Sequence, residues 1–252
     1  MSKFFVSSNQ INNNVIEIIG EDINHIKNVL RLSNGDEIKI CDKDNSQNYL
    51  CEIFNISNEK ISCNIIEKIS NETEGNVELH IFQGLPKADK MELIIQKGTE
   101  LGVSEFIPVT FKRSIVKLSG KDEMKKIERW NKIAEVAAKQ SGRDIVPNVR
   151  NIENVKKVCE NIKEYDIVLV AYEMEDENFI KSELLELKEN SKDKYKIAVV
   201  IGPEGGIDTE EIKLFKEYDA KIISLGKRIL RTETVALQVS SIIMYELENG
   251  GI

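Results

Sequence analysis

The sequence predicts an α/β protein in which a small β-rich domain precedes a larger domain built on a mostly parallel sheet. Short β-branched runs dominate residues 1–70, whereas strand-like and helix-like runs alternate from Val77 onward. Such alternation is typical of a parallel sheet with helices packed against it. Two glycine-containing turns, at 202–206 and 225–231, each follow a buried-strand run, so a ligand site is expected at the ends of these strands.

Residues 1–70 are expected to form a small barrel with one helix. Its strands are expected at 15–19, 37–41, 48–53 and 60–66, where β-branched residues alternate roughly with polar ones. Apolar residues at helical spacing predict the helix at 21–31. The polar stretch 70–76 has no apolar periodicity, and we interpret it as the linker to a second domain at 75–252.

The second domain is expected to alternate strands and helices along its length. The strands are expected at 78–82, 105–109, 167–171, 197–201 and 221–225. The helices are expected near 87–101, 121–141, 152–162, 177–189, 208–217 and 233–248. Ligands of such sheets bind beyond the carboxyl ends of the strands, so the loops after the last three strands are predicted to converge on one crevice.

The turn Gly-Pro-Glu-Gly-Gly at 202–206 leaves its backbone uncovered, so a flat ligand can lie against it. It is not a familiar phosphate loop, because it lacks the Lys-Ser or Lys-Thr pair of a Walker loop and the G-x-G-x-x-G spacing of a dinucleotide site. A tight turn without a ligand is the alternative for this turn alone. The second turn contains Arg228 and Arg231, which favours a shared pocket.

These two turns resemble the signature of the RsmE-type 16S ribosomal RNA uridine N3-methyltransferases, which belong to the SPOUT class of knotted methyltransferases. The second reads Leu-Gly-Lys-Arg-Ile-Leu-Arg-Thr-Glu-Thr-Val-Ala at 225–236 and departs from the pattern only in Glu-Thr-Val-Ala, where Glu-Thr-Ala is usual. Segments 25–31, 90–103 and 130–143 also resemble the family in the family's own order. The similarity covers nearly the whole chain.

The resemblance implies a SPOUT-type parallel sheet with a C-terminal trefoil knot, preceded by a PUA-like barrel that binds RNA. It implies S-adenosylmethionine as the methyl donor and N3 of a uridine in 16S ribosomal RNA, within the small ribosomal subunit, as the acceptor. It also implies a homodimer, and the helix at 233–248 has an apolar stripe that fits a dimer interface or the core of a monomer.

The cofactor site is expected to combine apolar walls, open backbone and two carboxylates. The expected residues are Glu173, Ile201, Gly202, Glu204, Gly205, Gly206, Leu225, Gly226, Ile229 and Leu230. The apolar members suit adenine, and the carboxylates suit ribose hydroxyls or the amino group of the methionine part. For Glu204 the alternative is a carboxylate that interacts with the amides of the following helix.

Arg231 and Glu233 are the candidate catalytic residues. The nitrogen N3 of uracil is protonated at neutral pH, and a cation near the base edge favours its ionisation. The alternative for Arg231 is a structural salt bridge, for example to Glu233. A carboxylate such as Glu233, or water, would take the proton. The candidate RNA contacts are Arg31, Lys87, Arg113, Arg143 and Arg228, each with a solvated surface charge as the alternative.

Composition agrees with a cytoplasmic RNA-modifying protein without a metal. The net charge is −8, but residues 87–150 contain 14 Lys and Arg against 9 Asp and Glu, which is a local excess of five positive charges. Charge alone favours the alternative of a solvated helix surface with i,i+4 pairs, and it indicates RNA only together with the motifs. The four cysteines form no C-x-x-C pair, so neither a zinc site nor a disulfide framework is indicated. No run has the length of a membrane span, and the N-terminus lacks a signal pattern.

Two other functions remain open from the sequence. The chain could be a non-catalytic RNA-binding or assembly factor with a vestigial pocket, which titration with S-adenosylmethionine would distinguish. It could also be a knotted methyltransferase that modifies a ribose or a guanine in transfer RNA. The barrel-first order and the Leu-Arg-Thr-Glu-Thr segment at 230–234 favour the uridine reaction.

Overall fold

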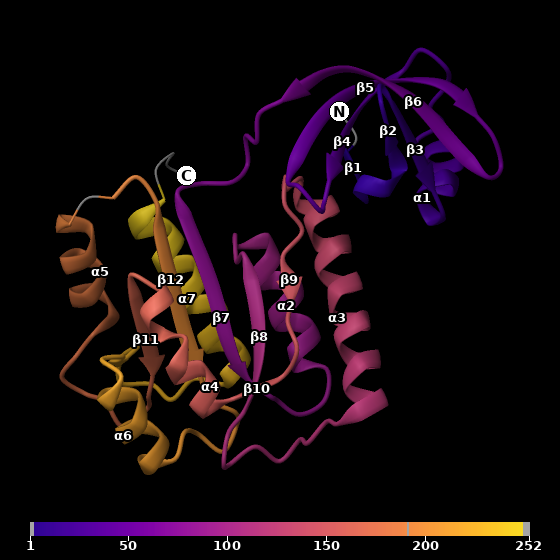
Figure 1. Ribbon diagram of the computed structural model, residues 1–252. Helices are drawn as coiled ribbons and strands as arrows, with labels where there is room; N and C mark the ends of the chain where they lie inside the picture. The colour runs from indigo at the N-terminus through magenta and orange to yellow at the C-terminus, as the bar shows by residue number, and fades with distance from the viewer. Residues whose placement is uncertain (1–2, 191, 249–252) are drawn as a thin grey trace. The chain divides into compact units, whose positions relative to one another are not determined.

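The chain folds into two compact units, which we describe separately. The computed structural model describes residues 3–190 and 192–248 (Figure 1). The first unit comprises the chain up to Glu74 together with Ala138–Val146, and the second comprises Gly75–Ala137 and the chain from Pro147 onward. The first unit therefore includes the end of a long helix and the turn behind it, which the sequence did not indicate.

The first unit is built on one six-stranded sheet in the order β1-β4-β5-β6-β3-β2. Its strands are β1 (Lys3–Val6), β2 (Ile11–Asn12), β3 (Val15–Ile19), β4 (Glu37–Asp42), β5 (Gln47–Ile56) and β6 (Lys60–Ile69). The two long strands pair with register shifts at Leu50/Cys51 and Ile53/Asn55. Such irregularities bend and twist a sheet, and this one curls around a core of isoleucines.

The predicted barrel is an open half-barrel, because β1 and β2 are the two edges of the sheet in the described residues. These two short edge strands were not predicted. The predicted helix at 21–31 is shorter, with α1 (Glu21–Asn24) followed by a single π-helical turn at His25–Val29. Arg31 then ends the helical segment with a left-handed φ of 55°.

Asp144 joins the linker and the returning segment 138–146 to the sheet of the first unit. Its carboxylate accepts hydrogen bonds from Lys3 Nζ at 2.6 Å, Asn48 Nδ2 at 2.6 Å and the backbone N–H of Thr73 at 2.9 Å. Burial opposes its ionisation, but the Lys3 ammonium and the Thr73 backbone lower the pKa of Asp144 to about 2. A buried carboxylate with these partners stabilises the unit when it is ionised.

The second unit is a parallel sheet in the order β10-β8-β7-β12-β11-β13, with β9 paired to β8. Its strands are β7 (Val77–Gly84), β8 (Glu105–Thr110), β9 (Asn148–Val149), β10 (Glu153–Asn154), β11 (Ile167–Ala171), β12 (Tyr195–Ile201) and β13 (Lys221–Ile223). Its helices are α2 (Lys90–Glu100), α3 (Gly120–Ser141), α4 (Val155–Glu160), α5 (Ile180–Glu189), α6 (Thr209–Glu217) and α7 (Thr232–Leu247). Short 3₁₀ helices lie at Ser8–Gln10 in the first unit and at Ile162–Glu164 in the second unit.

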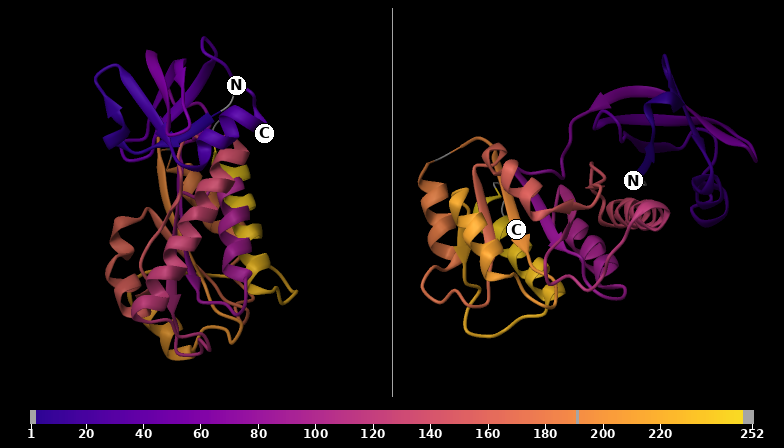
Figure 2. Two further views of the ribbon diagram at one scale, coloured as in Figure 1. Left: turned by 90° about the vertical axis from the view of Figure 1, so that its right-hand side faces the viewer. Right: turned by 60° about the horizontal axis from the view of Figure 1, so that its bottom comes forward.

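Helices cover both faces of this parallel sheet (Figure 2). α4 and α6 pack with one face through a core that includes Val158, Val200 and Phe215. α7 packs on the other face against β7 and β12 and also contacts α2 and α5. The central strand β12 is apolar and buried on both sides, as expected for the middle of a parallel sheet.

The predicted elements of the second unit agree with the structure, with bounds that differ by a few residues. β13 ends at Ile223, so Leu225 lies in the loop, and the two-residue strands β9 and β10 were not predicted. The apolar stripe expected along the last helix divides between core and surface, because Ile243 is fully buried while Tyr245 is 76% exposed. No described helix combines the length and apolar character needed to cross a membrane.

Candidate active site

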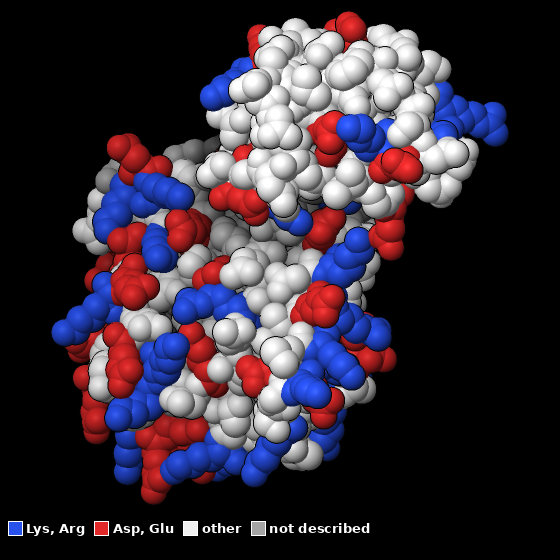
Figure 3. Space-filling view, turned by 45° about the vertical axis from the view of Figure 1, so that its right-hand side comes forward, with Lys and Arg blue, Asp and Glu red and all other residues white. Residues whose placement is uncertain are grey.

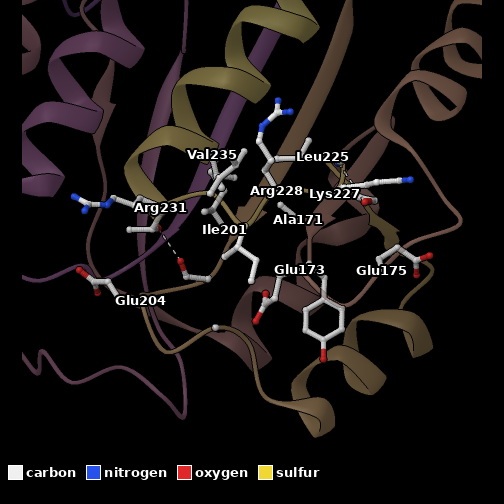
Figure 4. Close-up of a pocket in the computed structure, with 18 of the residues that line it drawn as sticks. Ala171, Glu173, Glu175, Ile201, Glu204, Leu225, Lys227, Arg228, Arg231 and Val235 are labelled. Carbon is white, nitrogen blue, oxygen red and sulfur yellow. Dashed lines mark hydrogen bonds between the residues drawn. The ribbon is translucent and has the colours of Figure 1, made fainter.

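A cavity of about 760 Å³ opens at the carboxyl ends of β11, β12 and β13 (Figure 4). Three loops line it, at 171–176, 201–206 and 224–232, together with Lys90, Phe179 and Val235. These three strands are neighbours in the sheet, so their loops meet at one edge. The crevice predicted from the strand order is therefore present.

The loop after β12 depends on glycine for close approach. A side chain at Gly84, at the end of β7, would place its Cβ 2.5 Å from Pro203 N. Gly206 has a φ of 71°, and a Cβ there would lie 2.5 Å from Glu173 Oε1. The Glu173 carboxylate thus lies directly against the glycine turn, and only glycine fits both the space and the backbone.

Buried hydrogen bonds attach the start of α7 to the sheet. Thr232 Oγ1 donates to the carbonyl of Gly202 at 2.8 Å and accepts a hydrogen bond from Gln83 Nε2 at 2.8 Å. Gln83 is fully buried and Thr232 is 7% exposed. The turn at 202–206 and the segment with Arg231 are therefore linked through one hydroxyl.

Glu204 faces α2 rather than the helix that follows its own turn. Its Oε1 accepts a hydrogen bond from the backbone N–H of Lys87 at 3.0 Å and another from Lys90 Nζ at 3.0 Å. Burial opposes ionisation of Glu204, but these two donors keep the pKa of its carboxyl below the ordinary value. Lys90 Nζ also lies 3.3 Å from Glu233 Oε2, so one ammonium pairs with two carboxylates.

Three cations lie at the rim of the cavity, and all three side chains are exposed. Lys227, Arg228 and Arg231 line the cavity, and Figure 4 shows them directed to different sides of it. Ile229 is 87% exposed, whereas Ile201 at the end of β12 is only 2% exposed. The cavity thus has an apolar interior beside a basic rim.

The structure brings most of the expected cofactor residues to this cavity. Those that line it are Glu173, Ile201, Gly202, Glu204, Gly206, Leu225, Gly226, Ile229 and Leu230. Gly205 does not line it, and a Cβ there would lie 3.0 Å from the carbonyl oxygen of Arg113. Arg231 lines the cavity, whereas Glu233 does not line it and pairs with Lys90 at 3.3 Å.

The expected RNA contacts lie in different surroundings. Arg31 and Lys87 are exposed. Arg113 pairs with Asp208 at 3.2 Å. Arg143 is 5% exposed, and its guanidinium pairs with Glu74 at 2.6 Å, which is the setting of a structural ion pair. In Figure 3 the second unit shows Lys and Arg interspersed with Asp and Glu on the visible face.

Sequence reasoning did not assign Lys90, Gln83 or Thr232 to the site. Lys90 stands in the segment 90–103 that resembles the family, and Thr232 stands between the two candidate catalytic residues. Their positions in these motifs were the available signal, but their partners lie more than one hundred residues away. Among the described residues, no group of three or more His, Cys, Asp or Glu is arranged to hold a metal ion.

The chain is similar in sequence to known RNA methyltransferases. Residues 73–244 match an RNA methyltransferase domain, and residues 18–66 match an RNA methyltransferase PUA domain. The Ribosomal RNA small subunit methyltransferase E of Bacillus subtilis (strain 168) is 40% identical over 231 residues, which cover 92% of this chain and 90% of that protein. The chain belongs to the ribosomal RNA small subunit methyltransferase E family.

Other members and solved structures agree with this assignment. The methyltransferase E of Mesomycoplasma hyopneumoniae (strain 232) is 34% identical, covering 94% of this chain and 96% of that protein. A crystal structure of a hypothetical protein is 38% identical with a TM-score of 0.83, covering 97% of this chain and 98% of that one. A Legionella pneumophila structure with bound SAM is 25% identical with a TM-score of 0.79, and 96% of each chain is covered.

Proposed function

We propose that this member of the family methylates N3 of a uridine in 16S ribosomal RNA, within the small ribosomal subunit, and uses S-adenosylmethionine as methyl donor. The observation that carries the proposal is the cavity at the ends of β11, β12 and β13, with its glycine turn, apolar interior and basic rim. The similarity to two ribosomal RNA small subunit methyltransferases E supports small-subunit RNA as the substrate.

The residues around the cavity fit S-adenosylmethionine. A volume of about 760 Å³ is within the usual range for small-molecule sites. Ile201, Leu225 and Leu230 can enclose adenine, while the backbone near Gly202 and Gly226 supplies polar partners. The carboxylate of Glu173 suits ribose hydroxyls or the cationic amino group. When bound, S-adenosylmethionine supplies an electrophilic methyl group on a positively charged sulfur.

Three members of the expected cofactor set have weaker support as direct contacts, and Gly205 is one of them because it does not line the cavity. Glu204 already accepts hydrogen bonds from Lys87 and Lys90, which leaves it a supporting role at the wall of the cavity. Ile229 lines the cavity but is 87% exposed, so we propose that it contacts the RNA at the rim rather than adenine alone. Exposed apolar side chains of this kind help to unstack a target base.

The residues near the rim suit ionisation of uracil. The Arg231 guanidinium can contact the flat edge of the base and stabilise the negative charge that forms when N3 loses its proton. The proton passes to water or to Glu233, whose side chain is 14% exposed beside Lys90. The electron pair on N3 then forms the bond to the methyl carbon as the carbon–sulfur bond breaks.

RNA would be held mainly through phosphate contacts and shape. Arg31, Lys87 and Arg228 have exposed side chains and remain our candidates. Arg113 is a weaker candidate because it pairs with Asp208. We leave Arg143 out of the set, because burial and its bond to Glu74 give it a structural role.

We further propose that the chain has two domains, at 1–70 and 75–252, and that its C-terminal segment forms a trefoil knot. We also propose that the protein is a homodimer located in the cytoplasm. The buried bonds that tie Thr232 to Gln83 and Gly202 support a threaded segment, since they fix the chain after β13 among earlier strands. The exposed Tyr245 on α7 supports a second copy as partner. The PUA-like first unit is the proposed RNA-binding part.

Nucleoside mass spectrometry of 16S ribosomal RNA tests the proposed reaction. Small subunits that lack the modification, incubated with the protein and S-adenosylmethionine, should gain N3-methyluridine. Methyl transfer to another nucleoside, or none, would overturn the proposal. Titration with S-adenosylmethionine in the same preparation separates an enzyme from an assembly factor, because the latter would show no binding.

A further inference from the structure

Lys90 occupies a junction of three chain segments at the cavity. It is the first residue of α2 and lines the cavity. Its Nζ lies 3.0 Å from Oε1 of Glu204, in the loop after β12, and 3.3 Å from Oε2 of Glu233, in the first turn of α7. α2 and α7 pack against each other, so the packing of these helices supports the junction.

The two carboxylates around Lys90 are shielded enough for their charge to matter. The side chains of Glu204 and Glu233 are 26% and 14% exposed. Hydrogen bonding to Glu204, followed by the bond to Glu233, raises the pKa of Lys90, so the ammonium stays charged. Without it, Glu204 and Glu233 would be two neighbouring negative charges with no ammonium between them.

Arg231 immediately precedes this junction and is not paired with it. Its side chain lies on the same side of the cavity as Glu204 in Figure 4. Nevertheless, in the part of the chain that the structure describes, no ion pair joins Arg231 to a carboxylate. Glu233, the carboxylate expected as its salt-bridge partner, is engaged by Lys90 instead.

Resting on the function proposed above, we infer that Lys90 is a positioning residue for methyl transfer. It pairs with Glu204, which lines the cavity, and with Glu233, and it compensates their charge, so that the Arg231 guanidinium stays available to the uracil base. If Lys90 were absent, Glu204 and Glu233 would attract Arg231 into an ion pair. Their uncompensated charge would also oppose formation of the uracil anion.

The other charged groups near Lys90 do not replace it. Asp89 precedes it on the same segment and adds a further negative charge. Glu92, in the first turn of α2, is paired with Arg129 of α3 at 2.8 Å. Lys87 donates only its backbone N–H to Glu204 and has an exposed side chain. Arg231 directly precedes the first turn of α7, which carries Glu233, and is the cation that we expect these carboxylates to attract.

Single-turnover methylation of small subunits over a pH series tests the inference. The variants are Lys90→Met and Lys90→Arg, with Lys97→Met as a matched control, because Lys97 lies on the same helix and pairs with Glu100 at 2.8 Å. We expect Lys90→Met to slow transfer roughly tenfold near neutral pH, equivalent to one unit of pKa, and to move the rate profile to higher pH. Lys90→Arg should restore most of the rate, and Lys97→Met should match the unmodified protein.

Binding of S-adenosylmethionine and thermal unfolding are measured on the same samples. We expect near-normal cofactor affinity in Lys90→Met. If Lys90→Met folds poorly, Lys90→Arg still tests the role of the positive charge. The inference alone would be overturned by any of three results: Lys90→Met reacts as fast as the unmodified protein, Lys90→Met loses rate equally at every pH, or Lys90→Arg does not restore the rate. Absence of methylation by the unmodified protein would instead overturn the proposed function, and the inference with it.

Discussion

Replacement of Arg231 by alanine gives the sharpest test of the chemistry. The guanidinium is exposed at the rim in the free protein, where a charge pair 4 Å apart is worth only about 1 kcal/mol in water. A bound base displaces that water, and the same pair is worth about 4 kcal/mol at an effective dielectric constant of 20. Loss of one preorganised donor elsewhere slows reactions by roughly a hundredfold to a thousandfold, so we expect about a hundredfold loss for Arg231→Ala.

The fold should survive this change, because the buried contacts at the start of α7 belong to Thr232 and not to Arg231. Affinity for S-adenosylmethionine should change much less than the rate. Raising the pH should partly compensate for the loss, since more of the uracil ionises without help. Arg231→Lys should restore only part of the rate, because an ammonium cannot make two parallel contacts to the base edge.

Single-turnover methylation over a pH series, beside calorimetric binding of S-adenosylmethionine, decides the role of Arg231. A loss of cofactor affinity in proportion to the loss of rate would mean that Arg231 binds the cofactor or supports the fold. A rate defect that is identical at every pH would refute stabilisation of the uracil anion.

Four further predictions follow from particular contacts. Gly206→Ala should weaken S-adenosylmethionine binding at least tenfold by calorimetry, because the new Cβ would meet Glu173. Gly142→Ala is the control, because Gly142 also has a positive φ, 74°, but no atom lies within 4 Å of the new Cβ. It should cost about 1–2 kcal/mol of stability at most and leave cofactor affinity unchanged. Ile229→Ala should raise the KM for small subunits and leave the melting temperature and cofactor affinity unchanged; an equal loss of cofactor affinity would make it a wall of the adenine slot. Asp144→Asn should lower the melting temperature at pH 7 but not near pH 2. The pKa of Asp144 is lowered from 3.8 to about 2 in the folded protein, so its ionised carboxylate stabilises the fold above pH 3.8, and this stabilisation is lost as the pH falls toward 2. Light scattering should find a dimer that Tyr245→Glu converts to a monomer, and an unchanged mass would exclude this surface as the interface.

Much of the second unit could be predicted because its pattern is local. β12 is apolar from Ile197 to Ile201, and the glycine turn follows it directly, so the position of the cavity at the strand ends could be inferred from strand order. The first unit was harder, because its edge strand β2 contains only two residues and has too little alternation to detect. The half-barrel also differs from the predicted closed barrel at these edges.

The site itself was predictable in composition but not in its pairings. The sequence correctly indicated which loops line the cavity, yet Glu204 was expected to contact a ligand or its own following helix and instead accepts hydrogen bonds from Lys87 and Lys90. Arg143 was expected on the RNA face, but it is buried beside Glu74. The sequence shows which charged residues a motif contains. It does not show their ion-pair partners, because these come from distant chain segments whose position hydrophobic periodicity does not predict.

The first turn of α7 shows why these long-range pairings matter for function. Thr232 is bonded to Gln83, 149 residues earlier in the chain, while Glu233 is paired with Lys90 from α2. The backbone that carries Arg231 is therefore fixed by polar groups of β7 and α2, neither of which belongs to the glycine turns. The glycine turn at 202–206 and the proposed catalytic arginine are thus held by polar contacts from β7 and α2, so substitution of the buried Gln83 should alter the proposed methyl transfer without removing a contact to either substrate.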